Sequence, residues 1–124
     1  GDGSQFLPLR SKALTSHSQF AIYLFMKTEK LFKALGHEKR LKLLEWLKSP
    51  HDHFPAQKDG DLVLDGVCVI LIAEKMEVSQ PTATQHIRIL LDAGLVRSKR
   101  IGKWTFIRRN QTTLSRLACL MSEL

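Results

Sequence analysis

The side chains best suited to chemistry lie in residues 79–109, and the chemistry that they suit is recognition of a polyanion. This stretch contains seven Lys and Arg residues and one acidic residue, a net charge of +6. If its first half is helical, three polar side chains share one outward face and a fourth lies at the leading end: Thr82, Gln85 and Arg88, and Gln80. Gln and Arg side chains can make paired hydrogen bonds to adenine and guanine edges in a major groove. The pattern therefore predicts contact with DNA bases.

Two further groups in this stretch could contact phosphates. Ser79 is a good helix N-cap, and the free N–H groups of the helix that follows it suit a phosphate oxygen. Residues 95–100 and 104–109 are β-prone runs on either side of a glycine, which predicts a hairpin. Its tip would place three cations against the DNA backbone or in the minor groove: Lys99, Arg100 and Lys103. On the second strand, Trp104 and Phe106 alternate and are expected to pack inward.

The elements that must position these side chains are mainly helices. Residues 67–76 and 80–93 have the pattern of two helices joined by a short turn, an order typical of a helix-turn-helix. Gly94 ends the second helix, whose buried stripe recurs at helical spacing: Ala83, Ile87, Leu90 and Leu91. We therefore expect residues 67–109 to form a winged helix-turn-helix, in which the hairpin is the wing.

Three more helices are expected around this unit. Residues 18–35 have apolar side chains at helical spacing, and residues 20–26 are apolar on every side, which requires cover on two faces. A partner subunit would supply that cover, and the alternative is one deeply buried core helix. Residues 37–48 form the next helix, with Leu41, Leu44 and Leu47 inward and Lys39, Lys42 and Lys48 outward. Residues 112–124 form the last, whose apolar face is Leu114, Leu117, Ala118, Met121 and Leu124.

The composition narrows the function classes. The chain of 124 residues is 44% hydrophobic and carries 19 basic and 12 acidic residues, a net charge of +7 that favours polyanionic partners. No run approaches the roughly 18 to 20 apolar residues that cross a bilayer, and two cysteines are too few for a disulfide framework. There is no nucleophile–base constellation, glycine-rich phosphate loop or pair of carboxylates in an apolar setting. These features predict a cytoplasmic protein that has no membrane partner and is not an enzyme.

Two segments resemble the ArsR/SmtB family of bacterial transcriptional repressors, LGHEKRLKLLEWL at residues 35–47 and IAEKMEVSQPTATQHIRILLDAGLVR at residues 72–97. The resemblance covers about residues 18–124. It implies a homodimer built on the first and last helices, bound to operator DNA of two-fold symmetry and released when an effector binds. The positions that match the family's DNA-contacting helix are Gln80, Thr82, Thr84, Gln85 and Arg88.

Three features depart from the family's pattern. Glu77 stands where a helix-turn-helix turn often has glycine, so we expect this turn not to require a positive φ. The polar connection at residues 49–66, which could contain a short strand at residues 62–64, is longer than is usual. His37-Glu38 replaces a common Asp-Pro.

The cysteines and histidines do not predict a metal site or a cofactor. The family's Cys-x-Cys site matches Cys68 and Ile70, so only one thiol is present, and the last helix has neither His nor Asp. His51 and His53 in the 49–66 connection are too few ligands for a structural zinc site. Cys68 and Cys119 could form a redox pair, although neither a lowered pKa nor a close partner thiol is visible in the sequence.

Together these features predict a mainly α fold with a small β-hairpin, a winged helix-turn-helix that dimerises through its first and last helices. Residues 1–16 are expected to be a flexible arm that includes a tag remnant, and residues 17–124 the DNA-binding and dimerisation domain. The predicted function is a homodimeric repressor that an effector releases from double-stranded operator DNA. Two alternatives remain, a winged-helix module that binds protein or RNA and a thiol-based redox-responsive regulator that uses Cys68 and Cys119.

Overall fold

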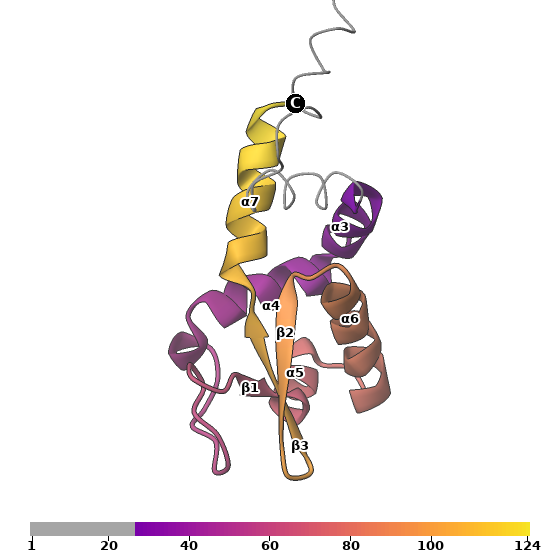
Figure 1. Cartoon of the computed structure of the whole chain (residues 1–124). Helices are drawn as coiled ribbons and strands as arrows, with labels where there is room; N and C mark the ends of the chain where they lie inside the picture. Colours follow the sequence, from indigo (N-terminus) through magenta and orange to yellow (C-terminus); the bar gives the residue numbers. More distant parts are fainter. Residues whose placement is uncertain (1–26) are drawn as a thin grey trace, which may run out of the picture.

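The computed structural model describes residues 27–124, so the expected arm at residues 1–16 and the apolar segment at residues 20–26 lie outside the described residues. Within the described part, five α-helices, one 3-10 helix and three strands follow in this order: α3 (Thr28–Leu35), α4 (Glu38–Lys48), η2 (Pro50–Asp52), β1 (Val67–Cys68), α5 (Val69–Met76), α6 (Gln80–Asp92), β2 (Val96–Ile101), β3 (Trp104–Arg109) and α7 (Gln111–Ser122). Helices α5 and α6 with the β2–β3 hairpin form the predicted winged helix-turn-helix (Figure 1). Helix α7 projects from the domain on the side opposite the hairpin tip (Figure 1).

The hairpin belongs to a three-stranded antiparallel sheet with the order β1-β3-β2. Strand β1 pairs Val67 with Ile107 and Cys68 with Phe106, so the helix expected to start at Val67 starts at Val69 instead. The expectation was wrong because helical periodicity cannot reveal a strand whose hydrogen bonds go to a segment about 40 residues away in sequence. The third strand fixes the position of the hairpin relative to α5.

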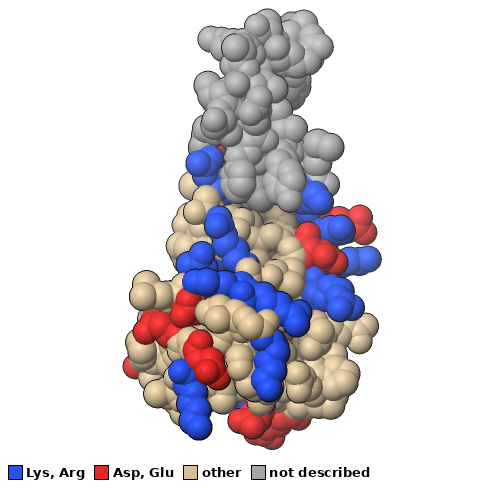
Figure 2. All heavy atoms as spheres, turned by 60° about the horizontal axis from the view of Figure 1, so that its bottom comes forward, with Lys and Arg blue, Asp and Glu red and all other residues tan. Residues whose placement is uncertain are grey.

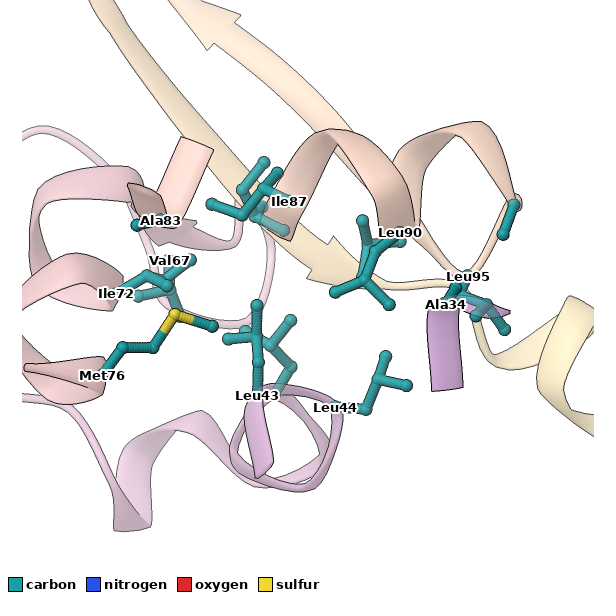
Figure 3. Close-up of a cluster of buried hydrophobic side chains, with 14 of the residues drawn as sticks. Ala34, Leu43, Leu44, Val67, Ile72, Met76, Ala83, Ile87, Leu90 and Leu95 are labelled. Carbon is teal, nitrogen blue, oxygen red and sulfur yellow. The ribbon is translucent and has the colours of Figure 1, made fainter. Parts of the chain in front are cut away.

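The hydrophobic core lies where α3, α4, α5 and α6 meet the sheet (Figure 3). The predicted stripe of α6 is confirmed for Ala83, Ile87 and Leu90, while Leu91 is half-buried. On α4 the expected inward face was wrong in one position, since Leu41 is 50% exposed. The buried residues of α4 are Arg40, Leu43, Leu44 and Leu47, a helical stripe whose first member is a charged residue that an apolar pattern does not count.

The 49–66 connection packs against the domain. Phe54 and Leu62 are buried in the core, and residues 62–65 form turns where the sequence allowed a strand. The carboxylate of Asp61 explains this difference, because its Oδ2 accepts hydrogen bonds from the backbone N–H groups of Val63, at 3.0 Å, and Leu64, at 2.7 Å. None of the helices in residues 27–124 combines the length and apolarity needed to cross a bilayer.

The turn between α5 and α6 also differs from the expectation, since Glu77 has a φ of 60° and lies in the left-handed region. The left-handed residue lets the chain hydrogen-bond the carbonyls at the end of α5, through Glu77 N–H to Glu74 O and Val78 N–H to Ala73 O, both at 3.1 Å. The Lys39 ammonium donates to a third carbonyl, that of Met76, at 3.0 Å. The prediction of a turn without positive φ is therefore wrong, because closing the helix end requires that conformation even at a non-glycine residue.

Candidate nucleic-acid interface

Helix α6 begins and ends as its sequence predicts. The Ser79 hydroxyl oxygen accepts a hydrogen bond from the Thr82 backbone N–H at 3.3 Å and donates one to the Thr82 hydroxyl at 3.0 Å. At the other end Gly94 has a φ of 75°, and the Leu95 N–H donates to the Leu90 carbonyl at 3.0 Å. These caps fix both ends of the helix, which gives its side chains defined positions.

The polar face of α6 is open. Gln80, Thr82, Gln85 and Arg88 are exposed, and Thr84 is half-buried. The side chains of Gln80, Gln85 and Arg88 make no hydrogen bond or ion pair with any other residue in the described part of the chain. The burial of the opposite stripe against the core explains why these groups point outward. This surface therefore holds paired donors and acceptors that no described residue of the fold satisfies.

A groove of about 290 Å³ separates this surface from the hairpin. From α6 it is lined by Gln80, Thr84 and Arg88, and from the hairpin by Ser98, Lys103, Trp104 and Thr105. Trp104 is half-buried at this boundary, whereas Phe106 is 1% exposed, so the prediction of inward packing is confirmed most fully for Phe106. The groove brings the expected base-reading side chains and one of the expected wing cations to the same side of the domain.

The three wing cations have different surroundings. The Lys103 ammonium lies 5.2 Å from the centroid of the Trp104 ring, and Arg100 Nε donates to the Gly102 carbonyl at 3.3 Å. Lys99 instead has its ammonium nitrogen 2.6 Å from Asp65 Oδ1. The Lys and Arg side chains form a band across this face of the molecule, with acidic side chains beside it (Figure 2). The structure thus brings Gln80, Thr84, Arg88 and Lys103 around one groove and gives Lys99 an acidic partner.

Sequence reasoning missed a cluster on the opposite side of α6. Arg40 is 8% exposed, and its guanidinium donates to the carbonyls of Ala34 at 2.7 Å and Lys33 at 3.0 Å, which end α3. Its Nη1 donates to His86 Nδ1 at 2.9 Å, since a guanidinium has donors only. The His86 ring also packs edge-on against the His37 ring, with 4.5 Å between centroids.

This cluster gives His86 a different role from the phosphate-side position expected of it. Burial is the largest cause that lowers the pKa of His86, followed by the nearby charges of His37, Arg40 and Lys39. A neutral ring can keep Nδ1 as the acceptor that Arg40 needs. The sequence signal that could have found this link is an arginine three residues before Leu43, on the buried stripe of α4.

Metal-binding and thiol chemistry have little geometric support in residues 27–124. This part of the chain contains no group of three or more His, Cys, Asp or Glu side chains that could hold a metal ion. Cys68 on β1 is half-buried and Cys119 on α7 is exposed, and both are free thiols. The two cysteines therefore belong to separate elements, the sheet edge and the projecting last helix (Figure 1).

Comparisons with known proteins agree with this geometry. A family model described as "Bacterial regulatory protein, arsR family" matches residues 67–98. The uncharacterized HTH-type transcriptional regulator YbzH of Bacillus subtilis (strain 168) is 43% identical over 93 residues, which are 75% of this chain and 93% of that protein. The arsenical resistance operon repressor of the same organism is 31% identical over 94 residues, 76% of each chain.

Solved structures establish the same fold. A crystal structure of an ArsR family transcriptional regulator has a TM-score of 0.60 at 19% identity and covers 79% of this chain and 86% of its own. The homodimeric winged helix-turn-helix DNA-binding domain of Mb0332 from Mycobacterium bovis has a TM-score of 0.55 at 22% identity, with 82% and 81% coverage. From the sequence identities and the matched helix-turn-helix, this chain belongs to the arsR family of bacterial regulatory proteins.

Proposed function

We propose that this protein is a homodimeric transcriptional repressor that binds double-stranded operator DNA in the cytoplasm, without enzymatic activity, and leaves the DNA when an effector binds. The observation that carries the proposal is the open polar face of α6 beside a basic hairpin. Membership in the arsR family supports DNA-binding regulation. The name of one relative, the arsenical resistance operon repressor, supports repression rather than activation.

In this proposal the helix reads bases and the hairpin contacts phosphates. Gln80, Gln85 and Arg88 are the residues whose free donors and acceptors suit base edges, and a bidentate contact of this kind discriminates by about 1–3 kcal/mol. Thr82 and Thr84 lie on the same surface, and Ser79 begins the helix whose first N–H groups suit a phosphate. The wing supplies the sequence-independent contacts, through Lys99, Arg100 and Lys103.

The dimer in this proposal uses the first and last helices. On α7 the side chain of Leu117 is buried, whereas Met121 is 47% exposed and Ala118 is exposed. Phe32 on α3 is 40% exposed. A second copy of the chain would cover these apolar groups, as supported by the relative from Mycobacterium bovis that is described as homodimeric. Two-fold symmetry would then present two α6 helices to half-sites about 34 Å apart.

The test is selection of duplexes from random-sequence DNA by the purified chain, with sedimentation to establish its oligomeric state. We expect enrichment of a two-fold symmetric sequence bound by a dimer. If about six phosphates are neutralised, the slope of log K against log salt should be roughly −5. A monomer that enriches no duplex, or that binds duplexes without salt dependence, would contradict the proposal and favour a module for protein or RNA.

The same selection tests the thiol alternative. We would repeat it with an oxidant, and separately with zinc, on the wild-type chain and on Cys68→Ser and Cys119→Ser. An effector that acts through thiols should lose its influence in at least one variant. If oxidant and zinc leave DNA binding unchanged, the effector must act through other groups of the protein.

A further inference from the structure

The 49–66 connection is fixed to the sheet that carries the wing. The Gln57 side chain joins the two, since Nε2 donates to the Gly66 carbonyl at 2.6 Å and Oε1 accepts from the Cys68 N–H at 3.0 Å. Gly60 packs on the Phe106 ring so closely that a Cβ there would lie 2.8 Å from a ring carbon. The connection is therefore part of the domain and can place a side chain precisely beside the hairpin.

Asp65 is the side chain that this packing places. The next residue, Gly66, has a φ of 109°, and a Cβ on it would lie 2.5 Å from the Ile107 carbonyl oxygen, so only glycine allows this approach of the backbone to β3. The Asp65 carboxylate is itself held, because Oδ2 accepts a hydrogen bond from the Asp61 backbone N–H at 2.8 Å. Its other oxygen, Oδ1, meets the Lys99 ammonium at 2.6 Å.

The register of the sheet explains why Lys99 reaches Asp65. Cys68, Phe106 and Lys99 are aligned across β1, β3 and β2. Side chains alternate along a strand, so Lys99 points to the face of the sheet opposite that of Ser98, which lines the groove shared with α6. The Phe106 ring and Gly60 cover the Lys99 face. Lys99 thus lies on the side of the wing that the connection occupies, away from the groove beside the recognition helix.

The charges make this contact an opposition between two segments. Residues 49–66 contain four Asp and one Lys, a net charge of −3, beside the basic hairpin. The hydrogen bond from Lys99 is the largest cause that lowers the pKa of Asp65, followed by the hydrogen bond from Asp61. The carboxylate is therefore ionised at neutral pH. The Asp65 side chain is 19% exposed and that of Lys99 is 51% exposed, so the pair remains accessible to a competing anion.

We propose, on the basis of the DNA-binding function proposed above, that Asp65 competes with DNA phosphates for Lys99, so that the 49–66 connection lowers the affinity of the wing for DNA. An ammonium that is neutralised by a fixed carboxylate releases fewer counterions when a phosphate arrives. Exposed ion pairs are weak and are screened by salt. Asp65 therefore attenuates the Lys99 contact and does not abolish DNA binding, while Arg100 and Lys103, which have no acidic partner among the described residues, contribute fully.

The experiment is Asp65→Asn in the full chain, with affinity for a selected duplex measured between 50 mM and 200 mM salt. Asn removes the charge and keeps an oxygen that can accept from the Asp61 N–H. If Lys99 gains one phosphate, the salt slope should steepen by about 0.9, and the affinity gain over wild type should be about 3.5-fold larger at 50 mM than at 200 mM salt. The matched control is Asp59→Asn, which removes the same charge from an exposed aspartate of the same connection that has no ion pair with another described residue.

A double variant assigns the effect to Lys99. Adding Lys99→Ala to Asp65→Asn should return the salt slope to the wild-type value. The inference is overturned if Asp59→Asn tightens binding as much as Asp65→Asn, if the double variant keeps the gain, or if Asp65→Asn weakens binding because Asp65 orients Lys99 toward DNA. If Asp65→Asn fails to fold, Lys99→Ala and Lys103→Ala decide, because Lys99→Ala must then reduce the slope less. A wild-type chain without salt-dependent duplex binding would instead contradict the proposed function.

Discussion

Arg40 and Arg88 lie on neighbouring helices of the same domain and use the same functional group in opposite ways. Every contact of the Arg40 guanidinium is internal, to two carbonyls of α3 and to His86 on α6. The Arg88 guanidinium is exposed and makes no hydrogen bond or ion pair within residues 27–124. The comparison teaches that a cation satisfied by the fold stabilises it, whereas one left without a partner is available to a ligand.

The two regions also meet at α6, because His86 and Arg88 project from the same helix. Arg40 attaches one side of α6 to the end of α3, and the other side presents the groove beside the hairpin. The contacts around Arg40 therefore set where the free side chains of α6 lie. Variants in the two regions should separate cleanly into changes of stability and changes of DNA recognition.

Arg40→Ala should have the largest effect and should act on stability. Removing the guanidinium leaves two carbonyls and the His86 acceptor without their donor, which we expect to cost about 2–4 kcal/mol in the free energy of unfolding. Chemical denaturation followed by circular dichroism measures this loss. Arg88→Ala is the matched control, since an exposed residue without partners should change stability by less than about 0.5 kcal/mol. Equal losses in the two variants would remove the distinction between the two regions.

Arg88→Ala should instead change DNA recognition. Loss of one bidentate contact to a base should weaken binding of the selected duplex by about 1–3 kcal/mol and relax the preference at one position of each half-site. Repeating the selection with the variant measures both effects. A uniform loss of affinity with unchanged preference would mean that Arg88 contacts phosphate and that α6 is misassigned as the base-reading element.

Lys103→Ala should have a smaller effect that does not depend on sequence. Its ammonium lies over the Trp104 ring at the edge of the groove, where we expect it to meet a phosphate. Losing that contact should make the salt slope shallower by about 0.9 and weaken specific and non-specific duplexes alike. Parallel salt titrations on a selected and a scrambled duplex would show this, and a loss confined to the selected duplex would contradict it.

The smallest expected effect is a dependence of stability on pH through His86. Its pKa in the folded protein is lowered, chiefly by burial, so the unfolded chain binds the proton more tightly. The contribution of His86 to stability is therefore fully present above its ordinary pKa of about 6.5 and decreases as the pH falls below that value. We would compare denaturation at pH 5 to 8 for wild type and His86→Asn, whose side-chain oxygen can replace Nδ1 as an acceptor. Identical pH profiles would show that His86 does not contribute.

The recognition helix could be predicted from its sequence because its determinants are local. The Ser79 cap, the Ala83, Ile87 and Leu90 stripe and the Gly94 end all depend on spacings of three to seven residues. The exposure of Gln85 and Arg88 follows from the same periodicity. Glu77 shows the limit of such reasoning, because residue type alone did not reveal that the end of α5 requires a left-handed residue there.

Other features depend on contacts between distant segments. Arg40 approaches His86 across 46 positions of sequence, and Lys99 approaches Asp65 across 34. A single sequence contains no periodicity that reports such pairs. The 49–66 connection was predicted as a long polar segment, yet Gln57 and Gly66 attach it to the sheet. Its influence on the wing could not be inferred before the register of β1 and β3 was known.

By itself the sequence determined which elements form and which face of α6 stays polar, since backbone capping and burial of an apolar stripe are decided within a few residues. Only the tertiary structure decided which cations remain available for DNA. Charge is a property of the residue, but its availability depends on the groups that folding brings within hydrogen-bonding distance. Arg40 and Lys99 meet such groups in this protein, and Arg88 does not.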